Sequence, residues 1–137
     1  MKKIILILAS ALTFIGCHSK DLHSFYSESL LTDIPNNKNY IYYVVIPHAG
    51  CPGCVTDAEE LLILNKNSNR LFFIITNYSS KKSLRLKLGE DVMKYKNVFL
   101  DSTNKYYANF FKDNIYPISI HLDKNKINDI LVGIPNI

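Results

Sequence analysis

Apolar residues along this chain occur in short, dense blocks that alternate with segments of helical spacing. The dense blocks are rich in β-branched and aromatic residues, which is typical of strands buried in a parallel sheet. In the other segments, apolar positions recur every three to four residues, which predicts helices with one buried face. The pattern predicts strands at 40–47, 70–76 and 97–100, helices at 55–65, 80–88 and 103–112, and a final hairpin of strands 118–123 and 126–132.

Several residues define how these expected elements begin, end and pack. Gly89 is expected to close the second helix, and Lys124-Asn125 to form the turn of the hairpin. The first helix carries acidic residues in its first turns, where the helix dipole favours them. In the third helix the aromatic residues are expected to pack inward. These acidic residues are Asp57, Glu59 and Glu60, and the aromatic ones are Tyr106, Tyr107, Phe110 and Phe111.

The order of elements predicts the fold class. Strands and helices alternate first and an antiparallel hairpin comes last, which indicates an α/β domain with a central mixed sheet. With 137 residues the chain is long enough for one such domain, expected at 40–137. The segment 17–39 is polar and contains a breaker at 35–39, so we expect a tether with one short element. Ser29-Leu30-Leu31 could form one helical turn or an edge strand.

The N-terminus has the pattern of a secretory signal. Lys2 and Lys3 precede a short apolar run, and Gly16-Cys17 closes it before a polar stretch. The segment 1–16 resembles a bacterial lipoprotein signal peptide, although Phe14 stands where Leu is usual. That resemblance implies that Cys17 becomes a lipidated N-terminus, anchored in a membrane of the cell envelope and facing the periplasm or the exterior. The alternative is an ordinary signal peptide that happens to contain a cysteine.

The charge balance argues against nucleic acid as a partner. The 16 basic and 12 acidic residues give a net charge of +4, which falls to +2 when Lys2 and Lys3 are removed with the signal. No basic stripe with interleaved aromatic residues is present. The one basic cluster is expected to be the solvated face of a helix, and it consists of Lys81, Lys82, Arg85 and Lys87.

The candidate chemistry lies in the motif Cys51-Pro52-Gly53-Cys54, between the first predicted strand and helix. A helix N-terminus carries unpaired N–H groups and partial positive charge, which lowers the pKa of a thiol placed there. Pro52 suits the first helical position because that position needs no N–H group. We expect Cys51 to be the exposed attacking thiol and Cys54, one turn on, the resolving thiol.

Two simpler interpretations of the motif were weighed. A purely structural disulfide in so small a ring stabilises by only about 2 kcal/mol, less any strain. Half of a zinc site would need a second pair of ligands, but the chain has no other CxxC and its histidines are dispersed. No metal and no cofactor are therefore expected. His48, three residues before Cys51, is expected either to stabilise the thiolate or relay a proton, or to be an exposed loop histidine.

The stretch YVVIPHAGCPGC, the Tyr116-Pro117 pair before ISIHLD, and the order of elements resemble the thioredoxin-fold superfamily. They are most similar to its TlpA-like and redoxin branch of extracytoplasmic proteins, over 40–133. The resemblance implies a three-layer fold that here lacks the C-terminal helix. It also implies that Pro117 is a cis-proline facing the cysteines, and that Tyr116, Pro52 and Gly53 lie beside the substrate. The chain departs from the family at Ala49-Gly50, where an aromatic residue is usual, and at Val45, where many thioredoxins bury an acid.

These observations favour a membrane-anchored thiol–disulfide oxidoreductase whose partners are protein or peptide thiols and disulfides of the cell envelope. Two alternatives remain open. One is a binding lipoprotein on the same scaffold without catalytic activity, and the other is a protein that handles Cu(I) through Cys51, Cys54 and His48, because soft thiolates suit Cu(I). A peroxidase is less favoured, since position 48 is His rather than the Thr or Ser that redoxin peroxidases generally use.

Overall fold

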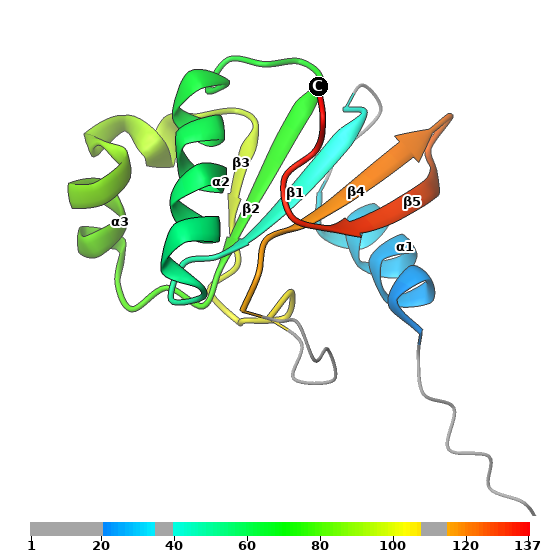
Figure 1. The fold of residues 1–137 in the computed structure, drawn as a ribbon, viewed down its shortest axis with the longest axis horizontal. Helices are drawn as coiled ribbons and strands as arrows, with labels where there is room; N and C mark the ends of the chain where they lie inside the picture. Colours follow the sequence, from blue (N-terminus) through cyan, green and yellow to red (C-terminus); the bar gives the residue numbers. More distant parts are fainter. Residues whose placement is uncertain (1–20, 35–39, 108–114) are drawn as a thin grey trace, which may run out of the picture.

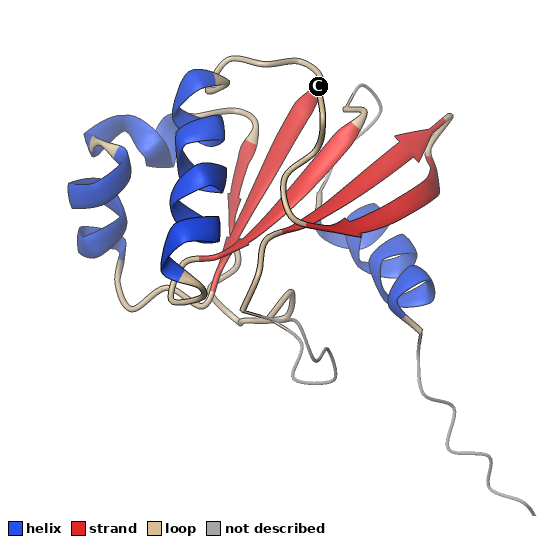
Figure 2. Cartoon of the chain, viewed as in Figure 1, coloured by secondary structure: helices blue, strands red, loops and turns tan. Residues whose placement is uncertain are grey.

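The computed structural model describes residues 21–34, 40–107 and 115–137. A five-stranded sheet lies between helices on both faces, so the domain has three layers (Figures 1 and 2). The predicted α/β class with a central mixed sheet is confirmed, and the fold is compatible with a thioredoxin-like one without its C-terminal helix. The elements are α1 (Leu22–Asp33), β1 (Tyr42–Pro47), α2 (Pro52–Leu64), β2 (Leu71–Thr76), α3 (Lys81–Leu88), the 3₁₀ helix η2 (Glu90–Lys94), β3 (Val98–Leu100), β4 (Ile118–Asp123) and β5 (Lys126–Val132).

The strand order is β3-β2-β1-β4-β5, with β1 at the centre. β1 pairs in parallel with β2, and β2 with β3, while β4 runs antiparallel to both β1 and β5. Parallel neighbours need a crossover connection, and α2 and α3 supply the two crossovers on the same face of the sheet (Figure 1). This arrangement places the end of β1 directly before the start of α2.

Alternation along β1 divides the core into two clusters. Tyr43 and Val45 point to the face that α1 covers, whereas Val44 and Ile46 point to the face that α2 and α3 cover. All four side chains are almost completely buried. Burial on both faces explains why the strand is apolar nearly throughout, as the sequence suggested.

The segment before β1 holds a longer helix than the sequence predicted. Instead of one turn or an edge strand, α1 has 12 residues and begins where the Asp21 side chain accepts a hydrogen bond from the backbone N–H of Ser24, at 2.7 Å. Tyr26, Leu30 and Ile34 recur at four-residue spacing and are buried against the sheet. This segment is therefore part of the core and not only a tether.

The predicted helix at 103–112 is not present in its described part. Residues 101–107 form turns, and 108–114, with Phe110 and Phe111, lie outside the described residues. The buried carboxylate of Asp101 accepts hydrogen bonds from the Thr76 hydroxyl, the Thr103 hydroxyl and the backbone N–H of Tyr106. These bonds hold the chain in turns and bury Tyr106, so the prediction of an inward-facing aromatic residue holds there without a helix.

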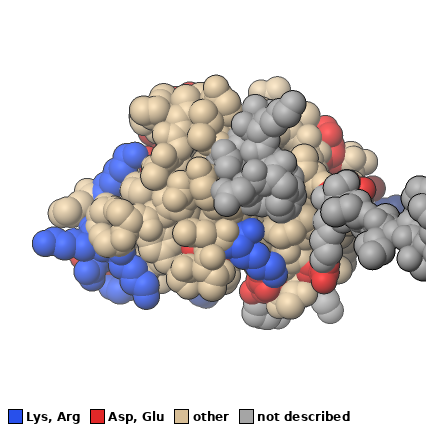
Figure 3. All heavy atoms as spheres, turned by 90° about the horizontal axis from the view of Figure 1, so that it is seen from below, with Lys and Arg blue, Asp and Glu red and all other residues tan. Residues whose placement is uncertain are grey.

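Other local predictions are confirmed. Ser80 caps α3 through a hydrogen bond from the N–H of Ser83, and Gly89 ends the helix with φ of 100°. Lys124 and Asn125 have φ of 46° and 65°, as a tight hairpin turn between twisted strands requires. The basic cluster lies on α3 with its charged groups at the surface, as Figure 3 shows on the side of the molecule where α3 lies.

The two ends of the chain are described to different extents. The predicted signal peptide 1–16 and Cys17 lie outside the described residues. Within the described residues, no helix has both the length and the apolar character needed to cross a membrane. After β5 the described chain continues without a helix, and Pro135 is buried against the sheet.

Candidate functional site

The cysteine motif lies at the junction between β1 and α2. Cys51 is the N-cap of α2, and Pro52 occupies the first helical turn, as the sequence predicted. The backbone carbonyl of Cys51 accepts the first helical hydrogen bond, from the N–H of Val55, at 2.9 Å. The Cys51 sulfur lies at the positive end of the helix dipole, close to the backbone N–H groups of Gly53 and Cys54.

Backbone hydrogen bonds fix the loop that carries Cys51. The N–H groups of His48 and Ala49 donate to the carbonyls of Thr76 and Asn77, at 2.9 and 3.2 Å. The N–H of Gly50 donates back to Pro47 at 2.7 Å, which closes a tight turn. His48 and Ala49 are thus tied to the end of β2 and the residue after it, and Gly50 to the end of β1, which limits how far the sulfur can move.

The two thiols are reduced and lie together. The sulfur atoms of Cys51 and Cys54 are 3.1 Å apart, and both residues are partly exposed. A hydrogen bond from the Cys54 thiol, helped by the backbone N–H groups of Cys54 and Gly53, lowers the pKa of Cys51 below that of an ordinary thiol. The same hydrogen bond, then burial and the charge of Cys51, raises the pKa of Cys54.

This asymmetry assigns different chemistry to the two sulfurs. When one proton leaves the pair, it leaves Cys51, because the remaining proton on Cys54 can bridge the two atoms. Cys51 is then a thiolate at the exposed start of a helix, and Cys54 stays protonated behind it. A thiolate beside a thiol at this distance can attack a disulfide and then be released by its neighbour.

The segment before β4 packs directly against the motif. The N–H of Cys51 donates to the carbonyl oxygen of Ile115 at 2.7 Å. Tyr116 is partly exposed, and Pro117 is buried with its carbonyl bonded to the N–H of Gly133. The structure therefore brings Ile115, the residue directly before the predicted Tyr116-Pro117 pair, into contact with Cys51.

The expected cis-proline is not found. No peptide bond among the described residues is cis, so the Tyr116–Pro117 bond is trans. The carbonyl of Ile115, two residues before Pro117, accepts the hydrogen bond from the N–H of Cys51 in this arrangement. The family resemblance suggested the cis form, but the general preference of X–Pro bonds for trans is what the structure shows.

Gly50 is required by this close approach, although the sequence marked it only as a departure from the family. A Cβ atom at position 50 would lie 2.2 Å from the Ile115 carbonyl oxygen and 2.8 Å from the Pro47 carbonyl oxygen. Both obstacles are backbone atoms, which cannot move without disturbing the loop. A Cβ atom at Gly53 would meet nothing within 4 Å.

We expect Gly50→Ala to lower the free energy of unfolding by about 1–3 kcal/mol, because overpacking forces the backbone to shift. The matched variant Gly53→Ala, inside α2, should leave stability unchanged or raise it by about 0.5–1 kcal/mol, since Ala favours a helix over Gly. Urea unfolding of both variants measures the difference. Equal stability of the two variants would contradict the close packing of Ile115 on the loop.

Three polar side chains meet beneath the same loop, and two of them, His48 and Glu59, are largely buried. Nδ1 of His48 is 2.7 Å from one carboxylate oxygen of Glu59, and Nζ of Lys87 is 2.6 Å from the other. The side chains of His48 and Glu59 are only 11% and 5% exposed, so the interpretation of His48 as an exposed loop residue is wrong. An ionised carboxylate can only accept hydrogen bonds, so His48 carries a proton on Nδ1.

This group connects three elements around the motif. His48 belongs to the loop before Cys51, Glu59 to α2 and Lys87 to α3. No hydrogen bond joins the His48 ring to either sulfur among the described residues. His48 therefore acts on the motif through the position of the loop and not by direct contact.

Sequence reasoning missed the roles of Glu59 and Lys87. It placed Glu59 in the first turns of the helix, where the dipole favours an acid, but Glu59 is buried. Lys87 is exposed, as predicted for a solvated face, but it is also the partner of Glu59. The available signal was position: Val55, Glu59 and Leu62 share one face of α2, and that face is otherwise apolar. An acid on such a face predicts a buried ion pair.

A metal centre finds no support in the described part of the chain. No group of three or more His, Cys, Asp or Glu side chains is positioned there to hold a metal ion. His48 in particular is engaged by Glu59 through Nδ1, so a site made of Cys51, Cys54 and His48 is not assembled.

The chain was compared with known protein families, sequences and structures. Neither a protein-family model, nor a curated protein sequence, nor a solved structure matches this chain. The functional argument therefore rests on the geometry of the site and on its chemistry.

Proposed function

We propose that this protein is a thiol–disulfide oxidoreductase of the cell envelope that works through Cys51 and Cys54. The observation that carries the proposal is the reduced pair of sulfurs, 3.1 Å apart at the start of α2, with the pKa of Cys51 lowered and that of Cys54 raised. Thiol pairs whose pKa values are shifted in opposite directions are typical of exchange chemistry, and such a difference gives a purely structural disulfide no advantage.

The reaction follows from the two assigned roles. The Cys51 thiolate attacks one sulfur of a substrate disulfide, which breaks that bond, forms a mixed disulfide and releases the other substrate sulfur as a thiolate that takes up a proton. Cys54 then gives its proton to solvent and attacks the Cys51 sulfur, which releases the second substrate thiol. Two electrons pass from the protein to the substrate. The same steps in reverse oxidise a dithiol substrate.

The surroundings of the motif suit a peptide substrate. Cys51 lies between two exposed neighbours, Pro52 on the helix side and Ile115 on the β4 side, and neither carries a charge. An extended peptide can approach the sulfur along this rim without desolvating a charged side chain. Lipidation at Cys17 would hold the domain at a membrane surface, within reach of proteins in the same compartment.

The pH dependence of alkylation tests the asymmetry on which the proposal depends. Because only a thiolate reacts, Cys51 should be modified by iodoacetamide at a pH below the value of about 8.5 typical of a free thiol, and Cys54 only at higher pH. Mass spectrometry of peptides quenched at each pH gives the two profiles.

Two single-cysteine variants serve as controls for that measurement. In Cys51→Ser the pKa of Cys54 should move down toward its ordinary value, because the hydrogen bond to the Cys51 sulfur, and with it the charge of that thiolate, is gone. In Cys54→Ser the pKa of Cys51 should stay below that of a free thiol, because the serine hydroxyl and the backbone N–H groups still donate to it. If both thiols of the wild-type protein titrate together at or above the ordinary value, the protein lacks the required nucleophile.

A further inference from the structure

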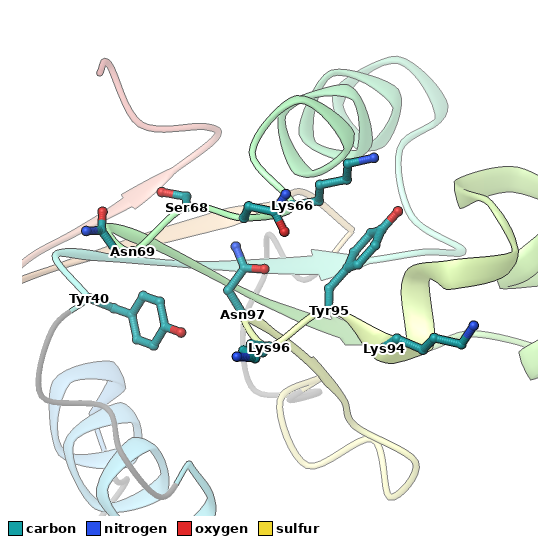
Figure 4. A pocket seen from close by; sticks show the side chains of 9 residues that line it. Tyr40, Lys66, Ser68, Asn69, Lys94, Tyr95, Lys96 and Asn97 are labelled. Atoms are coloured by element: carbon teal, nitrogen blue, oxygen red, sulfur yellow. The ribbon is translucent and has the colours of Figure 1, made fainter.

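A hollow lies at the opposite end of the sheet from the cysteine motif. It has a volume of about 440 Å³ and is formed where the α2–β2 connection, 66–69, faces the segment 94–97 before β3, with Tyr40 at one end (Figure 4). β1 runs from this end toward Pro47 and the motif, so the hollow and the thiols are separated by the length of the strand. The volume is within the range of sites for small molecules.

The walls of the hollow are polar and basic. Three lysines line it, at 66, 94 and 96, and no Asp or Glu is among its lining residues. Lys94 is held by Asp91 at 2.7 Å and points away from the hollow in Figure 4. Lys66 lies 6.0 Å from the centre of the Tyr95 ring, and Lys96 has no ion pair within the described residues. Lys66 and Lys96 are thus the two lysines of the hollow that form no ion pair among the described residues.

Asn97 gives the hollow an unused acceptor. It is only 1% exposed, and its side-chain N–H groups donate to the carbonyls of Asn65 and Leu71, at 2.9 and 3.0 Å, which fixes the orientation of the amide. The amide oxygen receives no hydrogen bond, and Figure 4 shows it turned toward the side on which Tyr95 lies. A buried acceptor without a donor is unfavourable, so a ligand that supplies a donor there gains affinity.

These observations together define the chemistry of a ligand. Lysines bind phosphate as compact point charges. The unpaired amide oxygen of Asn97 would be satisfied by a ligand that carries a hydroxyl donor in addition to its phosphate group. The rings of Tyr40 and Tyr95 supply flat walls at either end (Figure 4). We propose that this hollow binds a phosphorylated polyol, with Lys66 and Lys96 on the phosphate and Asn97 accepting from a hydroxyl group.

That chemistry is shared by free sugar phosphates and by the phosphoglycerol headgroups of lipids, and a titration distinguishes them. The full-length protein is titrated with glucose 6-phosphate, with glucose, with inorganic phosphate and with phosphatidylglycerol vesicles, and binding is followed through the NMR signals of Tyr95 and of the Asn97 side-chain amide. Saturable binding of glucose 6-phosphate, tighter than that of glucose or phosphate alone, assigns the site to free sugar phosphates. Binding to the vesicles alone assigns it to a lipid headgroup.

Charge-matched variants separate a built site from general attraction to a basic protein. We expect Lys66→Met/Lys96→Met to weaken binding about tenfold, because each exposed charge contact adds modestly to affinity. The control Lys81→Met/Lys82→Met removes the same charge from α3, outside the hollow, and should change binding less than about twofold. The proposal would be overturned if neither glucose 6-phosphate nor the vesicles bound saturably, if both double variants lost binding equally, or if glucose 6-phosphate bound saturably but no tighter than inorganic phosphate.

Discussion

Replacing Glu59 by alanine should destabilise the protein by about 2–4 kcal/mol, a large effect for one residue on a helix. The carboxylate is almost completely buried and holds His48 at 2.7 Å and Lys87 at 2.6 Å. Its removal leaves the largely buried His48 ring without an acceptor for its Nδ1 proton. Lys87 is 46% exposed and can turn to solvent, which keeps the cost below that of a fully buried pair.

The neighbouring acid supplies a matched control. Glu60 lies on the same helix and is exposed, so Glu60→Ala should change stability by less than about 0.5 kcal/mol. Chemical denaturation of both variants, with the midpoint and the slope recorded, measures the difference. If Glu59→Ala unfolds at the same urea concentration as Glu60→Ala, the buried ion pair does not hold α2, α3 and the loop together.

The consequence for the site is local. Because His48 begins the loop that ends at Cys51, the loss of Glu59 removes one of the bonds that position the nucleophile. We therefore expect Glu59→Ala to lower the rate of the Cys51 reaction as well as the stability, while Glu60→Ala leaves both unchanged.

The parts of the fold that the sequence predicted are those in which local pattern and burial agree. β1 and β2 are buried on both faces, and a nearly continuous apolar run such as 71–76 predicts a strand with burial on both faces. The turn at Lys124-Asn125 and the caps Ser80 and Gly89 each depend on one or two residues with known backbone preferences. Local patterns of this kind predict strands, turns and helix ends without knowledge of tertiary contacts.

The errors arose where a distant contact decides the local structure. In 101–107 the carboxylate of Asp101 reaches Thr76 in β2, 25 residues away, and the turn it organises replaces a helical turn. Around α1 the buried positions Tyr26, Leu30 and Ile34 are separated by mostly polar residues, so the sequence pattern resembles that of a linker, and their burial depends on contact with the sheet. Glu59 likewise finds its partners only in the folded state.

At the site, the chemistry-bearing residues were predictable and their supports were not. Cys51 and Cys54 follow from spacing and from the strand-to-helix junction, and the neighbourhood of Tyr116-Pro117 followed from family resemblance. The trans geometry of Pro117 and the close contact of Gly50 with Ile115 depend on the path of the segment before β4. Such a path is set by packing, which a single sequence does not display.

The two cysteines should respond differently to substitution, and this is the largest effect that we expect. Cys51→Ser should abolish the reduction of an insulin disulfide and the oxidation of a dithiol peptide, because a serine hydroxyl cannot form a mixed disulfide. Cys54→Ser should also stop turnover, but only after the first attack, because the nucleophile is intact and the resolving thiol is missing. The double variant should behave like Cys51→Ser.

The central claim is that Cys51 attacks and Cys54 resolves, and trapping tests it most directly. The Cys54→Ser protein is incubated with a peptide disulfide, quenched with acid and analysed by mass spectrometry. The account predicts a stable adduct with the mass of one peptide thiol, located on Cys51, with no adduct on the Cys51→Ser protein treated in the same way. An adduct that forms on Cys54 in the Cys51→Ser protein and not on Cys51 in the Cys54→Ser protein, or no adduct on either, would contradict it.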